Sequence, residues 1–193
     1  MAGLKTHGIT QETPKNLILG AGTFYKNLKF ATNKWDGAVL GATSGGGKVN
    51  ITPEYFKPEI DGATVAIRGM IWKVAEVATL EATLTEFSAG IIIDTLHLIE
   101  DTKAPVQGYK KYISQRNVSE DDFLDNIAYV GTLSDGRQII IILPNALCTG
   151  AMELAPKNKT NATYTITFEC TATFEQDDLE HLPYEIYYPE TTP

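Results

Sequence analysis

The stretch that most restricts the fold of this chain lies near its C-terminal end. From residue 163 to residue 175, polar and apolar side chains alternate at every position without a break. Successive side chains of a strand point to opposite faces of a sheet, so this pattern predicts an antiparallel strand with one buried face. The side chains predicted to be buried are Tyr164, Ile166, Phe168, Cys170, Ala172 and Phe174.

A second signal predicts a β-hairpin in the middle of the chain. Two β-prone runs, residues 127–133 and 137–143, flank the sequence Ser134-Asp135-Gly136. Asp-Gly supplies the positive φ angles that a tight hairpin turn requires. The unbroken apolar run at 139–143 is typical of a strand that is buried on both faces.

Other segments favour strands but leave details open. Residues 64–85 form the longest β-prone stretch, which fits one bent strand or two strands with a bulge near Gly69. Asp61-Gly62 predicts a turn before it. Residues 24–35 fit a short strand and a loop equally well, and residues 182–188 predict a final edge strand.

A single helix is predicted, from about Ala89 to about Ile99, with Ser88 as its N-cap. Together with seven to nine strands, it indicates a mostly β fold, a β-sandwich or rolled barrel with one flanking α-helix. Residues 1–16 are polar and aperiodic and are expected to form a flexible N-terminal arm. Residues 17–188 are expected to form a single domain, and residues 189–193 a C-terminal tail.

The segment 41–58 is rich in glycine. Three consecutive glycines cannot sit comfortably in a helix, so Gly45, Gly46, Gly47 and Lys48 are predicted to form a mobile loop tip. The segment is not a phosphate-binding loop, because five residues instead of four separate Gly41 from Gly47. Val49 also stands where that loop has Ser or Thr.

Composition argues against several classes of function. Sixteen basic and twenty-four acidic residues give a net charge of −8, which disfavours binding to a phosphate backbone. No apolar run approaches the length of a membrane helix, so we expect a soluble protein without a membrane anchor. The two cysteines, Cys148 and Cys170, are expected to be small buried side chains.

No set of catalytic or metal-binding residues stands out. His7, His97 and His181 have no partners at ligand spacing, and the acidic clusters lack the pattern of a calcium loop. We therefore expect neither enzyme activity nor a cofactor or metal. The one basic cluster, Lys110, Lys111 and Arg116, is predicted to contact an acidic surface on a neighbouring subunit.

The order of these segments carries a resemblance to a known family. Leu40-Gly41-Ala42-Thr43 precedes the glycine-rich segment and the sequence Glu59-Ile60-Asp61-Gly62, and the chain closes with TATFEQDDLEHLPYEI at 171–186. In these elements, and in their order over nearly the whole chain, it resembles the major tail tube protein of long-tailed, siphovirus-like bacteriophages.

The resemblance implies a tail-tube type β-sandwich whose copies form homo-hexameric rings that stack into a hollow tube. DNA would pass through the tube without specific binding, and a tape measure protein and tail terminator and initiator proteins would be further partners. The protein would be made in the host bacterial cytoplasm and end in the virion tail. The arm and the loop at Gly45, Gly46, Gly47 and Lys48 would become ordered between rings.

An acidic lumen would repel the phosphate backbone and let DNA slide. Under this interpretation the polar faces of the two long β segments line the lumen, and the acids expected there are Glu76, Glu81, Glu169 and Glu175.

Two alternatives remain open at this point. One is a tube subunit of a contractile tail, a tailocin or a secretion system. The other, of a different class, is a monomeric β-sandwich that binds a ligand such as a carbohydrate through exposed aromatic side chains. Candidates for that role are Trp35, Tyr55, Tyr109 and Tyr112.

Overall fold

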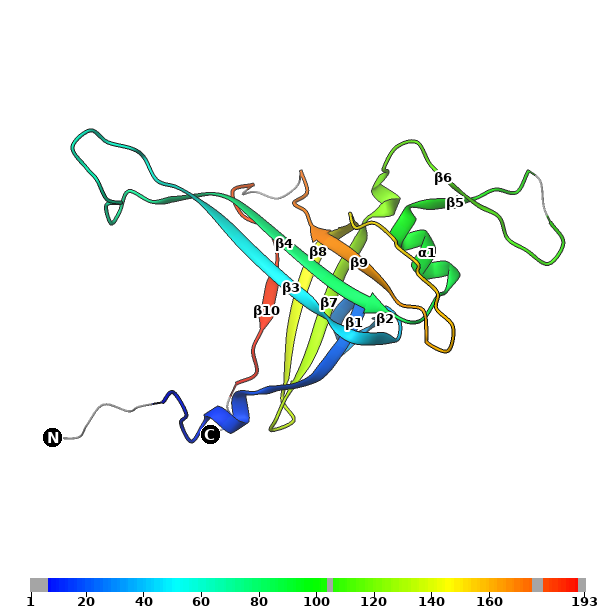
Figure 1. Ribbon diagram of the computed structural model, residues 1–193, viewed down its shortest axis with the longest axis horizontal. Helices are drawn as coiled ribbons and strands as arrows, with labels where there is room; N and C mark the ends of the chain where they lie inside the picture. The colour runs from blue at the N-terminus through cyan, green and yellow to red at the C-terminus, as the bar shows by residue number, and fades with distance from the viewer. Residues whose placement is uncertain (1–6, 104–105, 175–178, 191–193) are drawn as a thin grey trace.

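Eight of the ten strands in the described part of the chain form one bent antiparallel sheet (Figure 1). The computed structural model describes residues 7–103, 106–174 and 179–190. The strands of this sheet follow the order β2-β1-β7-β8-β9-β4-β3, and β10 pairs with β8. Their bounds are β1 (Ile18–Ala31), β2 (Lys34–Val39), β3 (Thr43–Phe56), β4 (Trp72–Leu84), β7 (Leu124–Leu133), β8 (Gln138–Cys148), β9 (Tyr164–Cys170) and β10 (Glu185–Tyr187). The prediction of a mostly β fold with one helix is confirmed.

The central hairpin β7–β8 is the one that the sequence predicts. Gly136 adopts a φ of 87° in the turn, and the Leu133 N–H donates to the Arg137 carbonyl at 2.8 Å. Ile127 pairs with Leu143, and Ala128 with Ile142. All four are buried, so this part of the sheet has apolar contacts on both of its faces.

The two faces belong to two separate apolar clusters. The larger contains Phe24, Leu80, Ile127, Leu143 and Phe168 and forms the main core. The smaller lies on the other face of β1, β7 and β8, where Trp35 packs against it; its buried members are Leu28, Ala128, Ile140 and Ile142.

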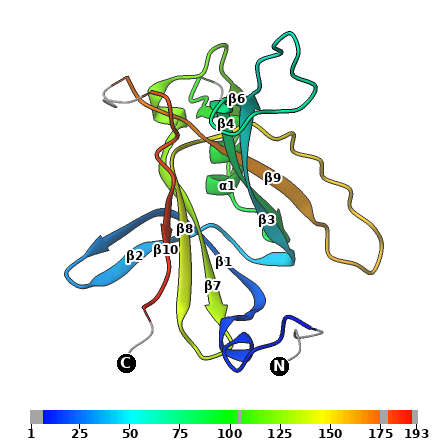
Figure 2. The same ribbon diagram turned by 90° about the vertical axis from the view of Figure 1, so that its left-hand side faces the viewer.

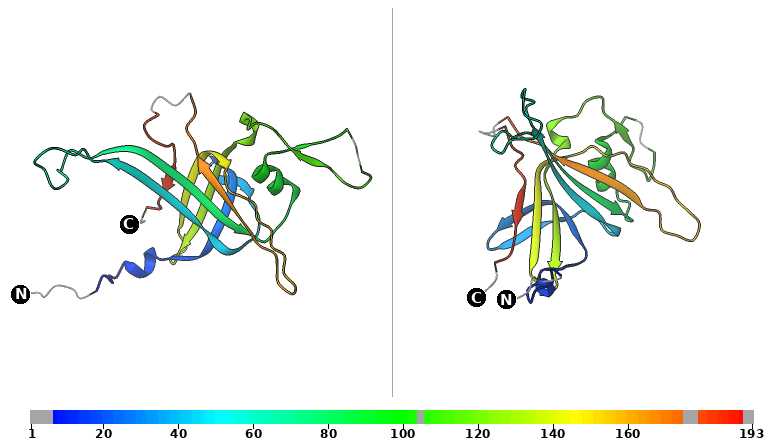
Figure 3. Two further views of the ribbon diagram at one scale, coloured as in Figure 1. Left: turned by 45° about the horizontal axis from the view of Figure 1, so that its top comes forward. Right: turned by 60° about the vertical axis from the view of Figure 1, so that its left-hand side comes forward.

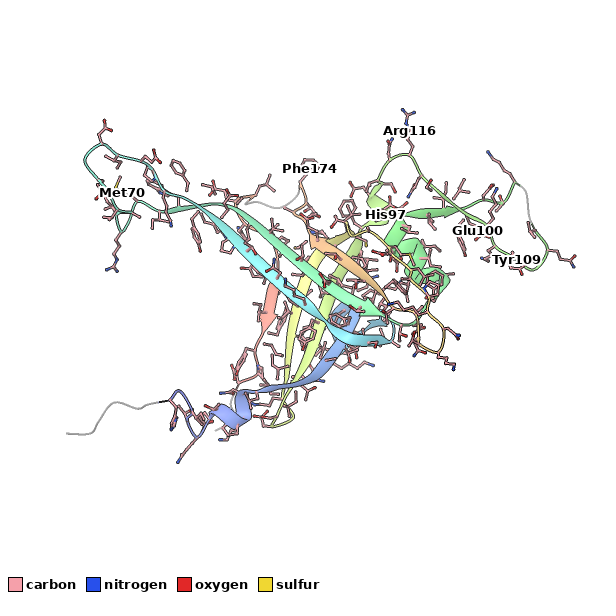
Figure 4. The ribbon with its side chains drawn as sticks, viewed as in Figure 1. Met70, His97, Glu100, Tyr109, Arg116 and Phe174 are labelled. Carbon is pink, nitrogen blue, oxygen red and sulfur yellow. The ribbon has the colours of Figure 1, made fainter. Side chains whose placement is uncertain are left out.

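Strand β9 shows the predicted alternation. Tyr164, Ile166, Phe168 and Cys170 are buried, while the intervening residues are exposed or half-buried. The strand ends at Cys170, which is earlier than predicted. Phe174, predicted to be buried, is fully exposed (Figure 4).

The segment that the sequence leaves open, residues 24–35, forms most of the hairpin β1–β2 (Figure 2). Its two-residue turn consists of Thr32 and Asn33, with φ angles of 53° and 59°, as a type I′ turn requires. The pairing of β1 with β2 shifts register between Lys26 and Lys29, and there the side chain of Asn126 on β7 bonds to the main chain of β1. Its side chain accepts a hydrogen bond from Leu28 N at 2.8 Å and donates to Leu28 O at 3.0 Å.

The prediction of a mobile glycine loop tip is wrong, because Gly45, Gly46 and Gly47 lie within β3. Gly45 and Gly46 have positive φ angles, and the pairing of β3 with β4 shifts register between Thr43 and Gly47. A Cβ atom at Gly47 would overlap the Glu81 carbonyl and the Phe24 ring. These glycines therefore allow a bulged strand to run close to its neighbours.

The prediction of a strand over residues 64–71 is also wrong. Strand β4 begins at Trp72, and residues 57–71 form the loop at the far end of the hairpin β3–β4, with the expected turn at Gly62 (Figure 1). Pairing of β4 with β9 starts only at Thr79. Beyond that point the hairpin projects from the sheet as a two-stranded ribbon.

Helix α1 (Ala89–Leu96) begins as predicted and ends early. The Ser88 side chain accepts a hydrogen bond from Ile91 N, and His97 ends the helix in the left-handed conformation with a φ of 51°. The chain continues into β5 (Leu98–Glu100), which pairs with β6 (Tyr112–Ser114) in a separate two-stranded sheet. We call residues 98–118 the β5–β6 arm; it and the β3–β4 hairpin project toward opposite ends of the molecule (Figure 3).

Two short 3-10 helices complete the structure, η1 (Thr13–Asn16) and η2 (Glu120–Asp122). Helix η1 lies in the predicted N-terminal arm and is attached to the β7–β8 turn, where the Ser134 hydroxyl donates to the Pro14 carbonyl. No helix in the described ranges is long and apolar enough to span a membrane.

Candidate assembly surfaces

The projecting end of the β3–β4 hairpin carries the most extensive run of exposed apolar side chains. We call this surface the apolar tip; its large apolar residues are Tyr55, Phe56, Ile60, Val65, Ile67, Ile71, Trp72 and Val74. Each is more than 40% exposed, and Val65 reaches 76%. The rings of Phe56 and Trp72 stack across the two strands with centroids 6.3 Å apart. Met70 lies at this end of the molecule (Figure 4).

The apolar tip carries exposed apolar side chains on both faces of the β3–β4 ribbon. Tyr55 has the parity of Val49, which packs against the core. The next residue, Phe56, pairs with Trp72 on the opposite face, because β4 has one unpaired residue, Val74, at a register shift. The ribbon is thus apolar past the last covering strand, and contiguous apolar surface of this kind marks an interaction site.

The sheet also has open edges. β3 is the last strand at one end of the order and β2 the last at the other, so within the described residues each has one edge without a strand partner. β3 has 14 residues, and a long unpaired edge is a template for pairing with another chain.

Two of the acids predicted to line a lumen share a polar face. In the paired register of β4 and β9, Thr79 lies opposite Glu169 and Glu81 opposite Thr167. Thr83 and Thr165 continue this face, and their hydroxyl groups are 3.2 Å apart. Lys48 on β3 lies opposite Glu81 and adds one cation. Glu175 lies outside the described residues.

Glu76 does not belong to this polar face, so its predicted place beside Glu81 and Glu169 is wrong. It has the parity of the buried residues of β4, and its side chain is 6% exposed. It lies 3.1 Å from Lys73 Nζ, and Tyr184 donates a hydrogen bond to it. Burial alone would raise the pKa of Glu76, but the hydrogen bonds from Lys73, the Leu182 main chain and Tyr184 hold it below its usual value.

The predicted basic cluster has acidic partners inside the chain. Lys110 forms an ion pair with Glu100 at 3.0 Å, and Lys111 with Asp101 at 2.8 Å, both within the β5–β6 arm. The hydrogen bond to Glu100 raises the pKa of Lys110. Arg116 is exposed where the chain returns from the arm to the body, away from the projecting end near Tyr109 (Figure 4). A contact of this cluster with a neighbouring subunit stays a prediction.

The cysteines are buried and have the chemistry of inert thiols. Burial raises the pKa of Cys148, and burial together with the nearby charges of Glu169 and Glu76 raises the pKa of Cys170 to about 12. His97 Nε2 lies 2.9 Å from the carbonyl oxygen of Cys148 and so bonds to its main chain. No group of His, Cys, Asp and Glu in the described ranges is arranged to hold a metal ion.

The aromatic residues named for a ligand-binding module do not lie together. Tyr55 is part of the apolar tip, whereas Tyr109 is 78% exposed on the β5–β6 arm, where half-buried Tyr112 also lies. Trp35 instead lines a shallow cavity of about 440 Å³. Its ring centroid lies 5.1 Å from that of Phe30 and 4.9 Å from that of Tyr187.

Sequence reasoning missed the apolar tip, although its signal is present. Aromatic residues at Tyr55, Phe56 and Trp72 flank the turn at Asp61-Gly62, which is typical of a hairpin with a cross-strand aromatic pair. It also missed the β5–β6 arm, whose strands have three residues each and no clear alternation.

Comparison with known proteins leaves the family open. No protein-family model matches the sequence, and no curated protein is significantly similar to it.

Proposed function

We propose that this chain is a structural subunit of a bacteriophage tail tube, which self-assembles into stacked, hexameric rings that form the channel for DNA. The observation that carries the proposal is the apolar tip. It leaves large apolar side chains uncovered on a projecting ribbon, and a second copy of the chain would cover them. The open edge of β3 offers a further site for pairing with another copy.

If the apolar tip of one copy binds a different surface on the next copy, the contact between them is heterologous. Such contacts generate closed rings or open filaments, depending on the rotation between neighbours. A stacked tube needs both, because its copies close into a ring and the rings repeat along the tube axis. The described residues offer a second feature suited to a channel, which is the polar, acidic face with Glu81 and Glu169. A tube subunit of a contractile tail, a tailocin or a secretion system would need the same surfaces.

The test is assembly of the purified chain over a concentration series, followed by light scattering and negative-stain electron microscopy. We expect rings or tubes to grow with concentration in the wild-type chain. Phe56→Ser/Trp72→Ser should stay monomeric at the same concentrations, because both rings are exposed and the core is left intact. Val118→Ser, at a residue that is 54% exposed outside the tip, is the matched control and should assemble normally.

A second candidate function, binding of a carbohydrate or similar ligand by a monomer, is favoured by the aromatic cavity around Trp35. Aromatic faces beside a few polar groups suit such ligands. A wild-type chain that stays monomeric throughout and binds glycans on an array would overturn the assembly proposal in favour of this one. Equal assembly of the tip variant and the wild type would instead exclude the apolar tip as the contact.

A further inference from the structure

The β5–β6 arm leaves the body of the molecule and returns to it at one place. Its first foot is His97, at the end of α1, and its second is Asp122, at the end of η2. Nδ1 of His97 lies 4.0 Å from Oδ1 of Asp122. Because a two-stranded sheet is marginally stable in water by itself, contacts at the feet decide how firmly the arm is held.

One nitrogen of the His97 ring has a hydrogen-bond partner, and the other has none among the described residues. Nε2 lies 2.9 Å from the Cys148 carbonyl oxygen, which can only accept, so Nε2 carries the proton. In the neutral ring Nδ1 is then an acceptor. It is buried and has no hydrogen-bond partner among the described residues. An acceptor thus faces a carboxylate, which is also an acceptor when it is ionised.

The Asp122 carboxylate is fixed in this position. Oδ1 accepts from Gln115 Nε2 at 2.6 Å, and Oδ2 accepts from Ser119 N at 2.6 Å and from the Ser119 hydroxyl at 3.0 Å. The side chain is 8% exposed. These three hydrogen bonds keep the carboxylate from turning away from His97.

The other titratable groups around His97 are already paired or neutral. Asp94, one turn earlier on α1, forms an ion pair with Lys26 at 2.5 Å. The Cys148 thiol on β8 has a raised pKa and is neutral near pH 7. Asp122 on η2 is therefore the charge that a proton on Nδ1 would meet. The carbonyl groups at the end of α1 also favour a cation at this position.

We propose that His97 and Asp122 form an acid-sensitive clasp that closes the feet of the β5–β6 arm. A proton on Nδ1 turns this nitrogen into a donor toward Oδ1 of Asp122 and converts two facing acceptors into a hydrogen-bonded ion pair. The clasp is closed while Nδ1 carries this proton and is released when the proton is lost. The proposal concerns a single copy of the chain and does not depend on tube assembly.

Hydrogen–deuterium exchange of the monomeric chain tests the clasp, with rates corrected for the intrinsic effect of pH. In the wild type we expect the amides of the arm to exchange at least about fivefold more slowly at about pH 5.5 than at about pH 8, the lower end of a coupling between two sites. His97→Gln keeps a donor for the Cys148 carbonyl but cannot gain a charge, so its arm should lose this pH dependence. His7→Gln, at an exposed histidine, is the control and should behave as the wild type.

Amides of the β7–β8 hairpin serve as the internal measure of global folding, which separates loss of the clasp from loss of the fold. Asp122→Asn provides a second variant, which retains an acceptor for Gln115 but no charge. Arm exchange that does not differ between the two pH values in the wild type would overturn the proposal. So would an unchanged pH dependence in both His97→Gln and Asp122→Asn with a protected hairpin.

Discussion

At the scale of single residues, Gly47 is the glycine of β3 that the packing demands. A side chain there would enter the space of the Glu81 carbonyl and the Phe24 ring, and Phe24 belongs to the main core. We expect Gly47→Ala to lower the free energy of unfolding by about 1–3 kcal/mol, the usual effect of overpacking a core. Urea denaturation with comparison of midpoints and m-values measures it.

Gly90 is the matched control for this substitution. It lies in the first turn of α1, and a Cβ atom there would meet no other atom within 4 Å. Gly90→Ala should raise the free energy of unfolding by up to about 1 kcal/mol, because alanine is the better helix former. Equal stability of Gly47→Ala and the wild type would show that β3 does not lie as close to β1 and β4 as described.

At the scale of elements, sequence patterns predicted those strands and turns whose structure depends on residues close together in the sequence. The alternation around Phe168 and the turn at Gly136 predicted β9 and the β7–β8 hairpin, because burial of one face and a positive φ angle follow from the sequence itself. The glycines at 45–47 were misread because their role depends on how close other strands approach. The strand predicted over 64–71 failed for a similar reason, since β9 does not extend that far along β4.

The attachment of β1 could not be predicted either, because it depends on a side chain distant in sequence. Asn126 takes the place of a strand partner for Leu28, with both amide atoms bonded in a buried position. Asn126→Ala leaves both main-chain groups of Leu28 unsatisfied. We expect a loss of about 1–3 kcal/mol in the free energy of unfolding, together with faster hydrogen exchange in β2. Asn117→Ala, at an exposed position, should change neither quantity; a stable Asn126→Ala would contradict the anchoring role.

At the scale of the whole molecule, the polar face follows from parity along β4 and β9. Glu81 lies on the polar face of β4 and Glu169 on that of β9, and the register of the two strands makes this one common face. Parity also separates Glu76 from this polar face, since its even spacing from Ala78 and Leu80 places it on the face of the buried residues. The apolar tip needed the structure, because only the end of β9 shows where the β3–β4 ribbon becomes uncovered.

If the chain forms a tube, the role of the polar face with Glu81 and Glu169 can be measured in virions. If this face lines the channel, Glu81→Gln/Glu169→Lys should form tubes of normal appearance, because neither side chain belongs to the core. Glu81 is changed only to Gln because Lys48 lies opposite it. Genome release from virions that carry this variant should be slower and less complete, since lysine attracts the phosphate backbone that the acids repel.

The control carries the same change of charge at two exposed acids elsewhere, Glu120→Gln/Glu153→Lys, and should release DNA normally. Electron microscopy of the virions and the time course of DNA release are the measurements. Normal release by Glu81→Gln/Glu169→Lys would show that the face looks away from the channel. Failure to form tubes would place it at a contact between subunits, where a buried unpaired cation prevents association.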